Sequence, residues 1–411
     1  MRIPMVPSPN WTEPVRSDLE TLVLTLKLIT PMFGGGHTAR EIDADEPVRA
    51  AAVRGHLRFW WRATAGPHHD PSVLFEEEAK RWGSAGSINL GKSVGGPGPV
   101  AIAVSCSNSG TPIRASEISD PRPKNKPLEG YMIFPFQRDK QNDEAIARTG
   151  IEFQLKVTCP TRYRAEIERA IRAWVAFGGV GARTRRGCGA LTVTAEPERW
   201  LMPADRTGRT AWLKELAPHG DGSAPAHSVL TGAEYVVASS SDPWPDVAEF
   251  WARFRKGHFG TDSEGEEINY IPRNGSRWSD YRQVLAPTVH DDVPRKVELG
   301  KPYLGMPLIY QRFADAPFAE TIQPQESTRM ASPVILKPVA ASDGTRAALV
   351  LVLNAPEPLA IMIGNRPTEL RIPTEDPVLA SLQQYEPLRA VCAAALVFFS
   401  GRVVVQSEAP R

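Results

Sequence analysis

One short segment carries arginines at a spacing that could bind phosphate groups. It is VRGHLRFWWRATAG, residues 53–66, with Arg54, Arg58 and Arg62 four residues apart. At about 100° per residue, this spacing aligns the three guanidinium groups along one stripe of a helix. Like charges at this spacing repel one another, and no acidic residue intervenes, so a polyanion would relieve the repulsion. The guanidinium fork matches phosphate oxygens, which predicts phosphate contact along this stripe. Trp60 and Trp61 fall on the apolar face and are predicted to be core.

A second candidate is the glycine-rich segment GGVGARTRRGCG, residues 178–189. It combines three arginines with five glycines and has no acidic residue: Arg183, Arg185, Arg186, Gly178, Gly179, Gly181, Gly187 and Gly189. Glycine lets a backbone approach a ligand closely or adopt positive φ. We predict a loop that follows a phosphodiester backbone. The alternative is a tight helix-to-strand connection whose arginines are solvated.

Two other motifs point less clearly to chemistry. GSINLGKS, residues 86–93, matches the phosphate-binding P-loop pattern, but it lacks the preceding strand and following helix that such a loop needs. We therefore predict an ordinary loop there. His37 follows a glycine run and could act as a general base on a ribose hydroxyl; the alternative is a loop histidine with no catalytic role. His68 and His69 are expected on a surface loop.

The sequence does not indicate a metal site, a cofactor or a membrane segment. The four cysteines are far apart, without a CxxC pair. No apolar run reaches the roughly 18 residues of a membrane span, and prolines replace the apolar stretch of a signal peptide at the N-terminus. These features predict a cytoplasmic protein without metal or cofactor.

Positive and negative charges nearly cancel over the whole chain. The 411 residues have a formal net charge of +1, which argues against coating nucleic acid by bulk electrostatics. Arginine outnumbers lysine 36 to 12. Either a GC-rich genome or phosphate recognition explains this bias. Any nucleic-acid site must therefore be a local patch.

Apolar periodicity predicts the elements that hold these motifs. Strands are expected at 19–29, 100–105, 131–136, 151–158 and 190–195, helices at 46–64 and 161–178, and loops at 83–99 and 107–130. Each half of this order reads strand, helix, strand, which fits a split βαβ plan. We predict an α+β fold of two ferredoxin-like (RRM-like) modules with inserted loops and helices.

The second half gives weaker signals. Helices are predicted at 210–216, 243–256 and 376–399, a hairpin from 332–340 and 346–354, and a final strand at 402–406. We divide the chain into a flexible tail (1–17), an N-terminal domain (18–200) and a C-terminal α+β domain (201–411).

These landmarks together resemble a known family. LKLITPMFGGG, VRGHLRFWWRA, FGGVGARTRRGCGAL, YLGMPLIY and RMASPVILKP occur in that order between about residues 20 and 340. They are similar to the first subunits of the type III-B CRISPR RNA-targeting (Cmr) effector complex, within the RAMP superfamily of RNA-binding proteins. Beyond the ASPVILKP element, the chain matches no further motif of that family.

The resemblance implies a non-catalytic subunit of an antiviral ribonucleoprotein. Its partners would be the guide RNA (crRNA), the target RNA and the other Cmr subunits, and it would cap the complex near the 3′ end of the guide. By position, the glycine loop and the helix with Arg54, His56, Arg58 and Arg62 would contact RNA.

Two other functions stay open at this stage. RAMP relatives that process guide RNA without a metal use a histidine as acid or base, and His37 would take that role in an endoribonuclease. Alternatively, the arginine patches meet acidic protein, and the chain is a scaffold.

Overall fold

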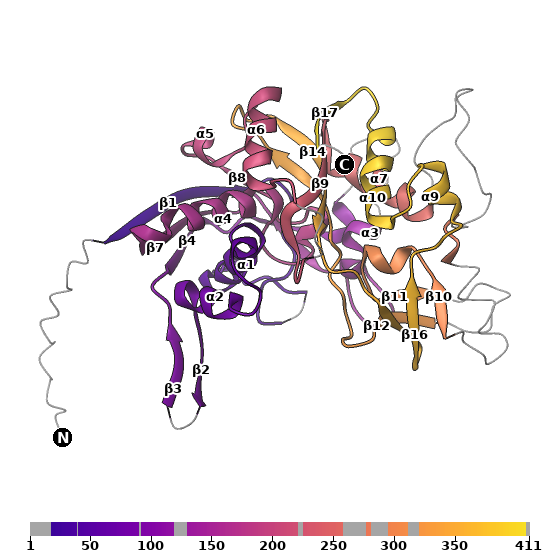
Figure 1. Ribbon diagram of the computed structural model, residues 1–411. Helices are drawn as coiled ribbons and strands as arrows, with labels where there is room; N and C mark the ends of the chain where they lie inside the picture. The colour runs from indigo at the N-terminus through magenta and orange to yellow at the C-terminus, as the bar shows by residue number, and fades with distance from the viewer. Residues whose placement is uncertain are drawn as a thin grey trace, which may run out of the picture.

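The computed structural model describes residues 18–38, 40–89, 92–118, 130–220, 225–257, 277–280, 295–310 and 320–407. The tail predicted at 1–17 lies outside these residues. Helices and several antiparallel sheets alternate along the chain (Figure 1), which confirms the α+β class. Among the described residues, no helix is long and apolar enough to cross a bilayer.

The first module contains a four-stranded antiparallel sheet and two helices. In chain order its elements are β1 (Leu19–Leu28), α1 (Ala50–Thr64), β4 (Ala101–Asn108), β7 (Glu152–Pro160), α4 (Arg164–Phe177) and β8 (Leu191–Val193). The strands lie in the order β4-β7-β1-β8, and every neighbouring pair is antiparallel. This is the order that a split βαβ plan produces. Alternate leucines of β1 point into the core because successive side chains of a strand face opposite sides.

The second module repeats this order of strands. Its elements are β9 (Val229–Ser239), α7 (Pro243–Lys256), β13 (Val334–Ala340), β14 (Arg346–Asn354), α10 (Pro387–Phe398) and β17 (Val403–Gln406). The strands lie in the order β13-β14-β9-β17, again with antiparallel pairs. The predicted helix at 243–256 and the hairpin that ends at residue 354 agree with these elements.

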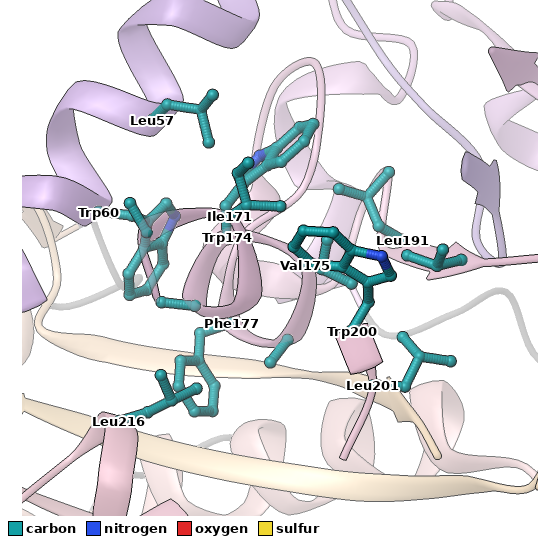
Figure 2. Close-up of a cluster of buried hydrophobic side chains, with 14 of the residues drawn as sticks. Leu57, Trp60, Ile171, Trp174, Val175, Phe177, Leu191, Trp200, Leu201 and Leu216 are labelled. Atoms are coloured by element: carbon teal, nitrogen blue, oxygen red, sulfur yellow. The ribbon is translucent and has the colours of Figure 1, made fainter. Parts of the chain in front are cut away.

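One hydrophobic core joins the two modules, and a second core lies on the other face of the second sheet. Side chains of α1 and α4 pack between the first sheet and one face of the second sheet, while α7 and α10 cover the other face. All residues of β13 are buried, as expected for a strand covered on both faces. Figure 2 shows part of the shared core, where Trp60, Trp174 and Trp200 lie together. Trp60 and Trp61 are 3% and 0% exposed, which confirms their predicted role in the core.

A third sheet, which the sequence patterns did not predict, lies beside the second module (Figure 1). Its strands lie in the order β10-β16-β15-β12-β11, with bounds Lys296–Glu298, Arg366–Arg371, Ala360–Ile363, Glu320–Pro324 and Leu308–Tyr310. These strands are three to six residues long. Such short segments give little periodicity to detect.

The remaining elements are short. They are α2 (Leu74–Trp82), β2 (Gly83–Asn89), β3 (Lys92–Pro97), β5 (Thr111–Arg114), α3 (Gly130–Ile133), β6 (Ile146–Thr149), α5 (Pro197–Trp200), α6 (Arg206–Leu216) and α9 (Pro377–Ser381), with 3₁₀ turns at Gly66–His68, Ala115–Glu117, Phe134–Phe136, Thr161–Tyr163, Thr184–Arg186 and Lys301–Leu304.

Several predicted elements are wrong. The loop predicted at 83–99 contains the β2–β3 hairpin, which projects from the first module (Figure 1). The P-loop match falls on this hairpin, and two of its residues, 90 and 91, lie outside the described part of the chain.

The strand predicted at 131–136 is helical, because its continuous apolar run fits a buried helical turn as well as a strand. The helix predicted at 46–64 begins at Ala50. The helix predicted at 376–399 is divided into α9 and α10.

Candidate nucleic-acid interface

A cleft of about 700 Å³ lies where the two modules and the third sheet meet. Its lining includes residues of α1, of the glycine loop and of the connections before β9, between β12 and β13, and between β14 and β15. Its charged and aromatic lining includes Phe59, Arg62, Arg185, His227, Tyr303, Glu326, Arg329 and Glu357. The cleft therefore brings together one residue from each of the two predicted arginine segments, Arg62 and Arg185.

Arg185 joins the first module to the second at the edge of this cleft. Its guanidinium carbon lies 5.3 Å from the centroid of the Phe59 ring, and Nη1 donates a hydrogen bond to the carbonyl oxygen of Ser332. Burial lowers the pKa of Arg185, but a guanidinium keeps its charge at neutral pH. It contacts no carboxylate among the described residues, so its positive charge is available to an anion in the cleft.

The arginine stripe of α1 has a counter-charge within the protein. Arg58 Nε and Arg62 Nη1 lie 2.6 and 2.7 Å from Oε1 of Glu78, whose side chain is only 6% exposed. α2 therefore supplies an acid that relieves the repulsion between Arg58 and Arg62, so the polyanion expected from the sequence is not needed for this purpose. Sequence spacing did not show this, since Glu78 lies 16 residues beyond Arg62. One carboxylate between two guanidinium groups still leaves net positive charge.

Arg54 stabilises the fold at the base of the hairpin. Its guanidinium donates to the carbonyl oxygens of Trp82 and Val100, both at 2.9 Å. With Arg58 it also lines a second, shallow cavity of about 450 Å³. His56, on the same helix, lies 6.3 Å from the ring of Trp174, and burial lowers its pKa. Arg54 and His56 thus lie outside the cleft that Arg62 lines.

The glycine loop is held between the modules by its other arginines. Arg183 has φ +56° and donates from Nε to the carbonyl oxygen of Met132 at 2.6 Å. Arg186 donates to the carbonyl oxygen of Val334 at 2.7 Å and to Oγ of Ser332 at 3.0 Å, and its guanidinium carbon lies 4.7 Å from a Trp251 ring centroid. Burial lowers the pKa of both guanidinium groups. These arginines therefore fasten the loop to neighbouring segments.

The glycines of the loop allow close packing against the protein itself. A Cβ on Gly178 would lie 2.6 Å from ring atoms of Trp60 and Trp174, and one on Gly179 would lie 2.7 Å from the carbonyl oxygen of Gly189. Gly181 and Gly187 both have φ +80°, a region that favours glycine. Their contacts account for the glycine content without a ligand. Contact of these glycines with RNA stays a prediction.

Lys337 joins the loop to β13. The side chain is fully buried, and Nζ donates to the carbonyl oxygens of Gly178 at 2.6 Å and Val175 at 3.3 Å. It thereby caps the C-terminus of α4, where a cation is favoured by the helix dipole. Burial lowers the pKa of Lys337 to about 7. The signal in the sequence is a single lysine within the otherwise apolar and proline-flanked run SPVILKPVA.

His37 is exposed in the loop after β1 and lines neither of the two cavities described above. Within the described ranges, no three His, Cys, Asp or Glu side chains gather as a metal site requires. The geometry therefore gives no positive support to a histidine acid or base at this position.

Comparison with known proteins finds a match to one superfamily in the first half of the chain. Residues 25–192 match the sequence model of the RAMP superfamily. We call these matched residues the RAMP segment. The RAMP segment includes the last four residues of β1, all of α1 and α4, and the whole glycine loop. It therefore holds Phe59, Arg62 and Arg185 but not the part of the cleft formed by later residues. No curated protein matches the sequence.

Solved structures with a similar arrangement share little sequence with this chain. The apo form of Cmr1 from Pyrococcus furiosus is 16% identical, with a TM-score of 0.49 over 82% of this chain and 88% of that one. A chain of the type III-B Cmr-beta complex bound to cognate target RNA is 10% identical, with a TM-score of 0.46 over 92% and 99%. A chain of that complex with AMPPnP and ssDNA present is 11% identical, with a TM-score of 0.43 over 90% and 98%.

Several cleft residues were missed by sequence reasoning. Phe59 lies three positions before Arg62, so helical spacing could have placed both on one side of α1 within the RAMP segment. Arg329 and His227 come from connections far away in the sequence, and only the fold brings them to the cleft. His227 Nε2 lies 3.1 Å from the carbonyl oxygen of Arg62.

Proposed function

We propose that this chain is a non-catalytic RNA-binding subunit of a type III-B CRISPR effector complex. In this proposal it caps the complex near the 3′ end of the guide RNA and helps to engage target RNA, together with the other Cmr subunits in the cytoplasm. The RAMP segment supports membership of an RNA-binding superfamily. The order of motifs from LKLITPMFGGG to RMASPVILKP supports the choice of subunit.

The repeated order of strands supports a division into two ferredoxin-like modules. Each four-stranded sheet places its third strand between its first and second, and its first strand between its third and fourth. We propose residues 18–200 and 201–411 as the corresponding domains. The cleft lies at the junction of these two domains, and a ligand bound there would contact side chains of both domains.

The observation that carries the functional proposal is that arginines line this cleft from both the first module and the facing connection. Arg62 and Arg185 come from the RAMP segment, and Arg329 is exposed on the opposite connection. Arginines placed this way bind phosphates without reading base sequence. Specificity would come from pairing between guide and target, as in other guided effectors.

Salt dependence of RNA binding tests the proposal. We expect the full-length chain to bind single-stranded RNA with an affinity that falls steeply as salt rises. The plot of log K against log salt has a negative slope. In Arg62→Ala/Arg329→Ala this slope should become less steep, by about 0.7 for each phosphate group that the variant no longer neutralises. Titration of labelled RNA at several salt concentrations measures both quantities.

A control variant removes one arginine charge outside the cleft. Arg346 is exposed at the start of β14, whereas the residues that follow the end of this strand line the cleft. Arg346→Ala should leave the slope unchanged. Equal slopes for the double variant and the wild type would show that the cleft does not bind phosphate. A tagged protein that copurifies with partner subunits but without RNA would favour a protein scaffold instead.

The non-catalytic assignment has its own test. Repeat RNA incubated with the purified chain and a chelator is expected to stay intact, because His37 lies outside both cavities. Gel electrophoresis of the RNA measures this. A defined cut that His37→Ala abolishes would contradict the assignment and establish an endoribonuclease.

A further inference from the structure

We infer that the cleft holds a single RNA strand with one base stacked on Phe59, which makes Phe59 a positioning residue for an unpaired nucleotide. This inference rests on the proposed function and deepens it. Stacking on an aromatic ring is tolerant of sequence because every base has a π-face. Phe59 would thus add affinity for single strands without adding sequence preference.

The accessible aromatic surface of the cleft lies at Phe59. Of the other aromatic side chains in its lining, Tyr303 is only 3% exposed, and the imidazole of His227 is half-buried with Nε2 3.1 Å from the carbonyl oxygen of Arg62. Phe59 is half-buried, and its ring contacts Trp60 in a T-shaped arrangement, with centroids 5.1 Å apart and planes at 88°. The guanidinium of Arg185 lies over one face of the ring, so a base would stack on the opposite face. A ring held in this way loses little conformational entropy when a base stacks on it.

The charges of the cleft orient the strand relative to this ring. Arg62 lies three residues after Phe59 on α1, which puts the two side chains next to each other on the helix surface. Glu326 and Glu357 lie in the connections that face the first module across the cleft. Arg329 adds one positive charge three residues after Glu326 on that far side. Most phosphates are therefore expected beside Arg62 and Arg185, with a further phosphate at Arg329 and one base stacked on Phe59.

The outer face of the first sheet is a poor alternative for base stacking. In RRM domains, aromatic side chains on the sheet surface stack the bases. Here the corresponding side chains of β1, β4 and β7 are small, polar or aliphatic, namely Thr21, Val23, Thr25, Lys27, Ala101, Ala103, Ser105, Ser107, Glu152, Gln154, Lys156 and Thr158. None of the outward side chains on these three described strands is aromatic.

The size of the cleft favours one strand over a duplex. Its volume of about 700 Å³ is that of a small-molecule site. Proteins that recognise double-stranded RNA by shape instead span roughly 16 base pairs of surface. The stacking residue and the cleft size therefore point to the same ligand, an unpaired segment.

The test combines a protein variant with RNAs that lack single bases. A set of single-stranded oligonucleotides of the shortest length that still binds, which leaves one register available, is prepared with one abasic position in each and titrated against the full-length chain. We expect one position at which loss of the base weakens binding about tenfold, within the range of base–aromatic stacking. Phe59→Leu should bind intact RNA about tenfold more weakly and lose nothing further at that position.

The control variant is Phe134→Leu, because Phe134 is 65% exposed outside the cleft. It should bind like the wild type, with the same sensitive position. Wild-type binding that is salt-dependent but equally strong for every abasic RNA would overturn the stacking inference and leave the proposed function intact. This measurement needs no variant, so it holds even if Phe59→Leu fails to fold. Absence of salt-dependent binding to any RNA would instead overturn the proposed function.

Discussion

Replacement of Gly181 by alanine is expected to destabilise the folded chain by about 2–5 kcal/mol. Gly181 has φ +80°, a conformation that costs an L-residue about 1–2 kcal/mol. An added Cβ would also lie 2.5 Å from the carbonyl oxygen of Phe33 and 2.7 Å from Cγ of Met32, and such overpacking costs roughly 1–3 kcal/mol. The backbone cannot easily retreat, since Ala182 donates to that same carbonyl at 2.7 Å. Denaturant unfolding measures the loss.

Gly344 provides the matched control. It has φ +83° in the turn between β13 and β14, but a Cβ there would meet no atom within 4 Å. Gly344→Ala should therefore cost only the backbone conformation, about 1–2 kcal/mol. Equal losses for the two variants would contradict the packing account. A Gly181→Ala protein of normal stability that binds RNA poorly would instead support a loop that follows the phosphodiester backbone.

Lys337 is expected to make stability depend on pH between about 7 and 10.5. Burial lowers its pKa from 10.5 to about 7, so within this window the unfolded chain binds a proton that the folded chain does not. Raising the pH removes that advantage of the unfolded state, and the free energy of unfolding should rise. The full difference corresponds to roughly 5 kcal/mol. Below pH 7 both states are protonated, and this contribution to the pH dependence disappears.

Lys337→Met is expected to remove most of this rise. Denaturant unfolding of the variant from pH 6 to pH 10 measures it. A smaller rise should remain up to about pH 9 because burial also lowers the pKa of Lys301, to about 8. Above that pH, the buried thiols of Cys188 and Cys392 act in the opposite sense, because burial raises their pKa values. Lys156→Met, which removes an exposed lysine of β7, should keep the wild-type profile. If Lys337→Met keeps it too, the amine of Lys337 does not lose its proton in the folded chain over this range.

Local patterns predicted the elements that are long and periodic. Alternating leucines predicted β1, and apolar positions three and four residues apart placed Trp60 and Trp61 in the core. The bounds of α7 and the hairpin of β13 and β14 also followed from periodicity and turn residues. The segment 131–136 was misassigned because its apolar residues follow no distinguishing period.

The roles of the arginines could not be predicted in this way. Arg185 donates to Ser332, 147 residues later in the chain, and Arg62 pairs with Glu78 on the next helix. The sequence contains the charges, but their acceptors are chosen by the packing of distant segments. The cleft is likewise built from connections that precede or follow strands of different sheets.

The sequence by itself therefore determined the fold class, most long elements and the family resemblance, because these depend on residue types at short, regular spacings. The tertiary structure decided which arginines hold the modules together and which face the cleft. It also decided that the loop glycines pack against Phe33, Trp60 and Trp174. The physical reason is that a hydrogen bond, an ion pair or a steric contact depends on distance in space, which spacing along the chain does not determine.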